Sequence, residues 1–165
     1  MNNQNNQNVS DAMTKVVLVM SPKESLREAY KLMKEHNIRH IPILENNRAV
    51  GILSDRDVLL CAKLDEIGGV VVPDIPVEEA MSRHPYVCKA GTKVSEVIKV
   101  MKKMKIDSIL VEGEARALSG LITSSDLMDL LDSLLKEKTT YNIPYDFEIV
   151  DYRDFAGCST AYLAD

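Results

Sequence analysis

The apolar positions of this chain follow one pattern twice. In the first half, an apolar run at 16–20 predicts a short strand, and an amphipathic segment follows it. Two further apolar runs, at 41–44 and 50–53, flank a polar tetrad and predict a hairpin. A second helix is expected over 57–62. The apolar residues of the amphipathic segment recur three and four positions apart, as on one face of a helix: Leu26, Ala29, Leu32 and Met33.

The second half repeats the order strand, helix, strand, strand, helix. Its hairpin is expected at 109–111 and 118–122, and its last helix over 126–136. The apolar face of its first helix contains Val94, Val97, Ile98 and Met101. In the first half, the helix start carries a capping signal. Ser21 can accept from a free amide, Pro22 suits the first helical position, and Glu24 stands three residues after the cap.

Direct alignment of the two halves identifies an internal repeat. Ala12-Met13-Thr14 recurs as Ala80-Met81-Ser82 at an offset of 68 positions, as 38–41 recurs at 106–109. After one extra residue in the turn at 112–117, the segment 51–57 recurs as 120–126. Neither copy alone covers its sheet. We therefore expect an α/β (α+β) fold of two pseudo-symmetric β-α-β-β-α repeats packed sheet to sheet.

The repeat sets the expected boundaries. They are a disordered N-terminus at 1–8, a first repeat at 9–63, a linker at 64–76, a second repeat at 77–137 and a tail at 138–165. Disordered segments are poor in aromatic residues, but the tail holds six of the eight in the chain. We therefore expect it to dock on the core, on a second subunit or on a partner protein. The six are Tyr141, Tyr145, Phe147, Tyr152, Phe155 and Tyr162.

Composition and charge exclude several classes of protein. The hydrophobic fraction of 45% is ordinary for a globular chain, no apolar run approaches the roughly 20 residues that cross a bilayer, and the Asn-rich start is not expected to be a signal peptide. Cys61, Cys88 and Cys158 form no CxxC pair and suit free thiols in the cytoplasm. Most of the net charge of −5 lies in the tail, and no dense basic stripe predicts nucleic-acid binding.

The candidate chemistry lies in the string Gly-apolar-apolar-Ser/Thr-x-x-Asp, found at 51–57 and again at 120–126, where a strand meets a helix. Ser54 and Thr123 have hydroxyls at the start of a helix, where free amides favour an anion such as phosphate. The carboxylates of Asp57 and Asp126 can accept from both vicinal hydroxyls of a ribose. The alternative is that these residues only cap their helices. Their occurrence at matched positions in both copies favours nucleotide binding.

With these motifs, the two copies resemble a tandem pair of CBS domains, the module named after cystathionine beta-synthase and found also in inosine monophosphate dehydrogenase and AMP-activated protein kinase. The resemblance covers both repeats. It rests on Ala-Met-Thr at 12–14, Ser-Pro at 21–22, Ile-Arg-His-Ile-Pro-Ile at 38–43 and the string at 51–57. It implies a cleft between the repeats that binds AMP, ADP, ATP or S-adenosylmethionine.

The resemblance also implies roles for individual residues. The Asp of each motif would hold ribose, the segment after Met-Thr or Met-Ser would line adenine, and the Arg-His pair would reach phosphate. The implied nucleotide-binding residues are Val16, Val17, Arg39, His40, Pro42, Ser54, Arg56, Asp57, Pro85, Tyr86, Val87, Ser108, Thr123 and Asp126.

The second copy departs from the family pattern. Where the first copy has Arg39-His40, it has Asp107-Ser108, which replaces a cation with an anion. If basic residues of one copy meet the phosphate held by the other, Arg39 and His40 would serve Asp126. Asp57 would then face Asp107 and Ser108, with partial compensation by Arg56. The Asp126 site is therefore the expected nucleotide site.

Other candidates are weaker. His84 and Cys88 lack further metal ligands nearby, and no carboxylate pair or P-loop indicates catalysis. We therefore expect a non-enzymatic regulator without a prosthetic group, which senses an adenine nucleotide and signals to an unknown partner protein. A homodimer is expected. Binding of S-adenosylmethionine, and an interaction module with no nucleotide, remain the alternatives.

Overall fold

A computed structural model describes residues 7–138, so the aromatic tail and the first six residues lie outside the described range. The chain divides into two compact units, 1–133 and 134–165, and both repeats lie in the first of them except for the last residues of the second repeat's final helix. Among the described residues, no helix is both long enough and apolar enough to cross a membrane. Cys61 and Cys88 are free thiols.

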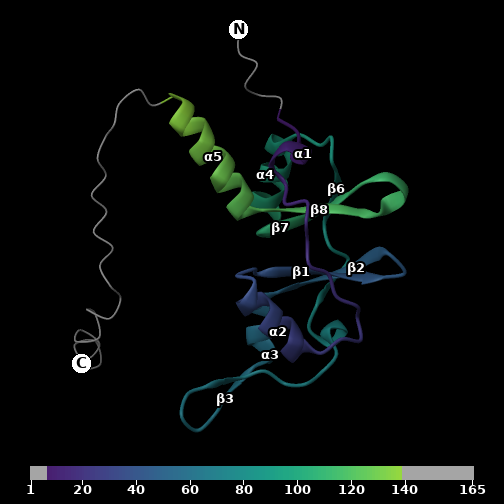
Figure 1. The fold of residues 1–165 in the computed structure, drawn as a ribbon, viewed down its shortest axis with the longest axis vertical. Coiled ribbons are helices and arrows are strands. Elements are labelled where there is room, and N and C mark those ends of the chain that lie inside the picture. Colours follow the sequence, from purple (N-terminus) through teal and green to yellow (C-terminus); the bar gives the residue numbers. More distant parts are fainter. Residues whose placement is uncertain (1–6, 139–165) are drawn as a thin grey trace, which may run out of the picture. The chain divides into compact units, whose positions relative to one another are not determined.

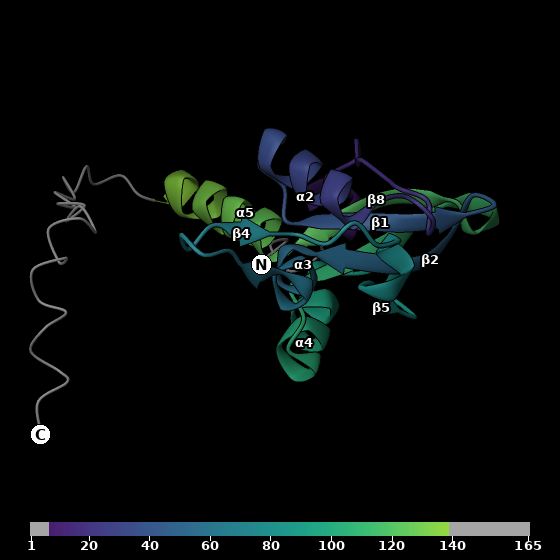
Figure 2. The same ribbon diagram turned by 90° about the horizontal axis from the view of Figure 1, so that it is seen from below.

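The first repeat is a three-stranded sheet with two helices on the side away from the second repeat (Figure 1). Its elements are α2 (Leu26–Glu35), β1 (His40–Glu45), β2 (Arg48–Ser54) and α3 (Asp55–Cys61). The hairpin is antiparallel, with Ile41 opposite Leu53. Its third strand, β5 (Ser82–Arg83), pairs with β2 and comes from beyond the linker, as Figure 2 shows at the sheet edge. The expected hairpin and both expected helices of this repeat are therefore present.

The second repeat has the same plan. In its sheet, β6 runs parallel to β7, and β7 pairs antiparallel with β8. The repeat consists of β6 (Val87–Lys89), α4 (Val94–Met104), β7 (Ser108–Glu112), the 3₁₀ turn η3 (Glu114–Arg116), β8 (Leu118–Thr123) and α5 (Ser124–Lys138). The mixed α/β fold of two repeats is thus confirmed.

The short segment that begins each repeat packs against the other repeat. α1 (Val9–Ala12) binds the second repeat, where the Val9 amide donates to the carbonyl of Thr92 at 2.8 Å and the Val9 side chain is fully buried. The 3₁₀ turn η2 (Val77–Glu79) binds the first repeat, with Val77 in its core and the Val77 amide donating to Glu24 at 2.8 Å. The two repeats therefore complete each other's cores.

The expected strand at 16–20 is wrong. Only Met20 pairs, in a single parallel bridge to Ile43, and Val16 is 92% exposed. The cause is the crossing between repeats, because Thr14 pairs with Leu121 of the second repeat while Met20 pairs with the first. A segment that spans the two sheets cannot follow the edge of either one.

The expected start of the first helix is also wrong by four residues. Ser21 and Glu24 form a closed turn in which the Glu24 carboxylate accepts from the Ser21 amide. The helix cap is Ser25, whose hydroxyl accepts from the amide of Arg27 at 3.2 Å. In α4, Ile98 lies at the margin of the expected apolar face and is 39% exposed. α3 and α5 each begin two residues earlier than expected, because Ser54 and Thr123 end their strands directly before the helices.

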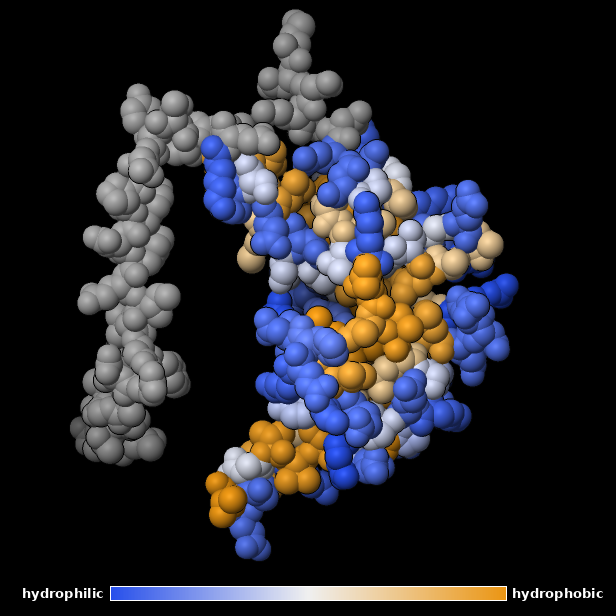
Figure 3. Space-filling model, viewed as in Figure 1, coloured by the Kyte–Doolittle hydropathy of each residue, from blue (hydrophilic) through white to orange (hydrophobic). Residues whose placement is uncertain are grey.

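The linker contains a short hairpin that the sequence did not predict. β3 (Lys63–Leu64) pairs with β4 (Val70–Val71), and the turn is held by Asp65, whose carboxylate accepts from the amides of Ile67 and Gly69. Its apolar side chains face solvent, with Leu64 73% and Ile67 93% exposed. They contribute to the apolar surface at the lower left of Figure 3.

Candidate functional site

The corner between β2 and α3 forms a reciprocal cap around Asp57. The Ser54 hydroxyl accepts from the Asp57 amide at 3.2 Å, while Oδ2 of Asp57 accepts from the Ser54 amide at 2.8 Å and from the Ser54 hydroxyl at 2.6 Å. The capping role considered above is therefore real. It uses one carboxylate oxygen, and Oδ1 of Asp57 makes no hydrogen bond to any residue in 7–138. A ligand can therefore still use this oxygen.

The matching corner of the second repeat is closed. Thr123 and Asp126 form the same cap, with the Thr123 amide donating to Oδ2 of Asp126 at 2.7 Å. Here the second oxygen is also engaged, because the Thr14 hydroxyl donates to Oδ1 of Asp126 at 2.8 Å. Ser82 is the counterpart of Thr14 in the repeat alignment, and it makes no such bond to Asp57. The two corners thus differ in the availability of one oxygen.

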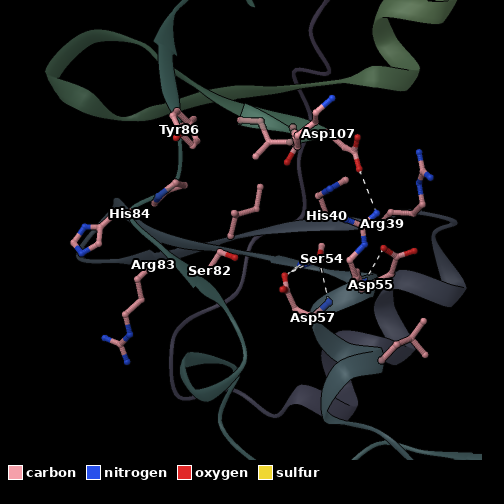
Figure 4. Close-up of a pocket in the computed structure, with 17 residues that line it drawn as sticks. Arg39, His40, Ser54, Asp55, Asp57, Ser82, Arg83, His84, Tyr86 and Asp107 are labelled. Atoms are coloured by element: carbon pink, nitrogen blue, oxygen red, sulfur yellow. Dashed lines mark hydrogen bonds and ion pairs between the residues drawn. The ribbon is translucent and has the colours of Figure 1, made fainter. Parts of the chain in front are cut away.

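A cleft of about 510 Å³ lies in front of the open corner and is lined by both repeats (Figure 4). This volume is in the usual range for small-molecule sites, about 300 to 1,000 Å³. The first repeat contributes Arg39, His40, Ile52, Ser54, Asp55, Arg56, Asp57 and Leu59, and β5 with the residue after it contributes Ser82, Arg83 and His84. The second repeat contributes Pro85, Tyr86, Lys105, Ile106, Asp107 and Ser108.

Four permanent cations and three carboxylates line this cleft. The cations are Arg39, Arg56, Arg83 and Lys105, and the carboxylates are Asp55, Asp57 and Asp107. Arg56 and Asp107 pair across the repeats with 3.9 Å between nitrogen and oxygen. Both side chains are more than half exposed, so the pair contributes little to stability. Arg83 donates instead to the carbonyl of Glu78 at 3.3 Å and points away from Asp57 in Figure 4.

His40 is a titratable residue of the cleft whose pKa is shifted by its surroundings. Burial lowers the pKa of its imidazole below the usual value of 6.5, opposed by the charge of Asp55 and reinforced by Arg39. The imidazole is therefore neutral at pH 7 and can donate or accept a hydrogen bond. Positive charge in the cleft at neutral pH comes from Arg and Lys side chains.

The structure brings together eight of the residues expected from the sequence. These are Arg39, His40, Ser54, Arg56, Asp57, Pro85, Tyr86 and Ser108. Thr123 and Asp126 lie at the closed corner, Pro42 is buried within β1, and Val87 lines a neighbouring groove. Val16 is exposed and Val17 is half-buried, in a segment that lies outside this cleft lining.

The expected pairing across the cleft is present only in part. Asp107 and Ser108 do share a cleft with Asp57, as expected, but Arg39 and His40 line the same cleft. Arg39 also reaches the second repeat, donating to the Ser125 hydroxyl at 3.3 Å, one residue from Asp126. Its guanidinium therefore lies between the two corners.

The sequence reasoning missed Ser82 and Lys105. The repeat alignment pairs Ser82 with Thr14 and Lys105 with Asn37, and since neither partner was a site candidate, the alignment gave no signal for them. Among residues 7–138, no group of three or more His, Cys, Asp or Glu side chains is arranged to hold a metal ion.

Comparison with known proteins gives a consistent result. A family model described as "CBS domain" matches residues 9–63 and 70–133. The inosine-5'-monophosphate dehydrogenase of Korarchaeum cryptofilum is 33% identical over 111 residues, which are 67% of this chain and 21% of that protein. The CBS domain-containing protein YhcV of Bacillus subtilis is 29% identical over 72% of this chain and 81% of its own length.

A solved structure has the same fold. The CBS domain pair of protein MJ0100, in complex with 5'-methylthioadenosine and S-adenosyl-L-methionine, superposes with a TM-score of 0.67 at 26% identity, covering 78% of this chain and 98% of that one. The chain spans about a fifth of the dehydrogenase and less than half of two relatives from Methanocaldococcus jannaschii, at 46% and 41% of their lengths.

Proposed function

The chain belongs to the CBS domain family, and from that premise we propose that it binds an adenine nucleotide in the cleft beside Asp57 and acts as a regulatory sensor. The observation that carries this proposal is the free Oδ1 of Asp57, which borders a cleft of about 510 Å³ lined by both repeats. Solved relatives support the ligand class, since the domain pair of MJ0100 holds two adenosyl compounds.

The ribose is assigned to Asp57. Its Oδ2 is fixed by Ser54, which holds the carboxylate in one orientation before any ligand arrives. Oδ1, which accepts from none of the described residues, has two lone pairs and can accept from both vicinal ribose hydroxyls. Charge-assisted hydrogen bonds of this kind contribute roughly 1.5 to 3 kcal/mol each.

The phosphate is assigned to the cations of the same cleft. Arg39 and Arg56 come from the first repeat and Lys105 from the second, so an anion here is held by both repeats. His40 adds a hydrogen-bond donor for the phosphate, because its neutral imidazole still has one N–H group. The base is assigned to the apolar part of the cleft, where Tyr86 is 41% and Leu59 51% exposed and can lose surface to a ring.

A ligand held by both repeats gives a route from binding to regulation. It stabilises one arrangement of the repeats over others by its difference in affinity, and a partner protein can recognise that arrangement. Exposed apolar side chains on α3 and α4, among them Leu60 and Met104, support a homodimer. Light scattering that gives a dimer mass at micromolar concentration tests this part.

A second candidate is an interaction module that works without a nucleotide. It is favoured by the hairpin β3–β4, whose exposed Leu64, Ile67, Val70 and Val71 form an apolar surface in the linker. Under this alternative the cleft is structural and no adenosyl compound raises the melting temperature.

Matched variants of the two carboxylates test the proposal. A ligand at 100 times its Kd stabilises the fold by about 2.7 kcal/mol, so a thermal-shift panel of AMP, ADP, ATP and S-adenosylmethionine identifies the ligand. Asp57→Asn keeps the shape of the side chain but removes its charge. Calorimetry should then show the Kd of the identified ligand raised about ten- to a hundredfold. Asp126→Asn is the control and should change it little.

Three results contradict this assignment. No response to any compound supports the interaction module. Loss of binding in Asp126→Asn together with unchanged binding in Asp57→Asn moves the ribose to the second repeat, the site favoured by the sequence alone. Tightest binding of S-adenosylmethionine replaces the nucleotide by that ligand.

A further inference from the structure

A second groove adjoins the cleft on the side of α4. It has a volume of about 400 Å³ and a floor formed by the apolar side chains of Ile98, Met101 and Leu127. Arg56, Lys105, Ile106 and Asp107 line both the cleft and this groove, so the two spaces share one wall. The groove therefore begins where the phosphate end of the proposed nucleotide site lies.

The wall of the groove is basic. Arg56, Lys102 and Lys105 line it, against a single carboxylate, Asp107. Arg56 pairs with Asp107 at 3.9 Å, and neither lysine has a carboxylate within 4.0 Å among the described residues. Two lysines with no ion pair to any carboxylate in residues 7–138 leave their charge available to an anion.

The backbone at Lys105 adds a second observation. Lys105 ends α4 in the left-handed conformation, with φ 57°, and Asn37 has φ 51° at the matching position after α2. Asn tolerates this conformation well, whereas a long side chain is uncommon there. The second repeat therefore places a cation, at some conformational cost, where the first repeat has the favoured residue.

We propose that this groove binds the distal phosphates of a nucleoside di- or triphosphate whose ribose is on Asp57. The inference rests on the proposed function and deepens it by naming the ligand class. A monophosphate ends at the shared wall and leaves Lys102 unused. S-adenosylmethionine carries a sulfonium, an ammonium and a carboxylate group on its extension, and the basic wall disfavours their net positive charge.

The shared wall also couples the ligand to the contact between repeats. Arg56 belongs to α3 and Asp107 to the turn after α4, so their ion pair joins the two repeats. A phosphate in the groove competes with Asp107 for Arg56, because the guanidinium fork can donate two hydrogen bonds to a phosphate as well as to a carboxylate. The length of the phosphate chain then decides whether this contact persists, which gives AMP and ATP different effects at one site.

Lys102→Gln tests the inference, with Lys103→Gln as its matched control. The two lysines are neighbours on α4, but Lys103 lines a different, apolar groove, so the control removes the same charge from the same helix. Calorimetric titrations use AMP and ATP on the full chain. We expect ATP to bind more tightly than AMP, and Lys102→Gln to weaken ATP about five- to tenfold with AMP changed less than about twofold. Lys103→Gln should leave both constants unchanged.

A second variant keeps the result independent of folding. Lys105→Asn introduces the residue that the first repeat uses in the same backbone conformation, so the fold is retained. It should reduce the preference for ATP over AMP. The inference is overturned if ATP binds no more tightly than AMP, if both lysine variants on α4 act equally, or if Lys102→Gln weakens AMP as much as ATP. Absence of all nucleotide binding, or binding insensitive to Asp57→Asn, instead marks failure of the proposed function.

Discussion

Thr14→Val removes the hydroxyl that closes the corner at Asp126. The bond is 2.8 Å long and its acceptor is charged, which places it in the class worth roughly 1.5 to 3 kcal/mol when shielded from water. Thr14 is exposed, so solvent reduces this value, and we expect a loss of about 1 kcal/mol in the free energy of unfolding. For a chain of this size the melting temperature should fall by about 2 to 4 °C.

The same substitution should change the number of bound nucleotides. In the wild type, both oxygens of Asp126 are engaged, Oδ2 by Thr123 and Oδ1 by Thr14. Removal of the Thr14 hydroxyl leaves Oδ1 of Asp126 available to a ligand, as Oδ1 of Asp57 already is. Calorimetry with AMP should then change from one site per chain to two, with the new site weaker.

Two control variants make this prediction decisive. Ser82→Ala alters the counterpart of Thr14, which makes no hydrogen bond to Asp57, so its unfolding free energy should stay within about 0.5 kcal/mol of the wild type. Thr14→Ser keeps the hydroxyl and should preserve one site. The reasoning is refuted if Thr14→Val has wild-type stability in urea titrations, or if the wild type already binds two nucleotides with similar affinity.

Two further predictions concern pH and packing. Because burial lowers the pKa of His40, the unfolded chain binds a proton at this residue more readily than the folded chain. The free energy of unfolding should therefore fall as the pH drops below about 6.5. Urea titrations of His40→Gln should show a flatter dependence of this free energy on pH. Gly120→Ala should destabilise by about 1 to 3 kcal/mol, since its Cβ would lie 2.6 Å from the backbone oxygen of Thr14. Gly51→Ala should lower the free energy of unfolding by less, because the flexible Met81 side chain can move aside. Equal losses for the two variants in urea titrations would contradict this argument.

The repeated parts of the fold could be predicted from the sequence. The offset of 68 positions locates both hairpins, and the spacing of Leu26, Ala29 and Met33 identifies the buried face of α2. These features are local, because they depend on periodicity within one element. The membership in the CBS domain family, expected from the ordered motifs, is confirmed.

The crossings between repeats could not be predicted in this way. The apolar run at 16–20 has the composition of a strand, but it lies in a crossing segment that pairs with the second repeat at Thr14 and with the first repeat at Met20. Whether Oδ1 of Asp126 is available to a ligand depends on Thr14, which is 112 positions away in the chain. Contacts between residues so far apart cannot be read from local periodicity. The sequence therefore named eight of the residues that line the cleft, but it did not predict how they are arranged.

The exchange of leading segments between the repeats has a consequence for how the chain folds. Val9 packs with Val111 and Ile122, so the core of the second repeat needs the first residues of the described chain as well as the last strand. Contacts at such separation require closure of long loops, and the rate of folding falls as the mean separation of contacting residues rises. Each repeat must also wait for the other before its own core is complete. We therefore expect the two repeats to fold together in one cooperative step, and neither repeat to be stable when expressed alone.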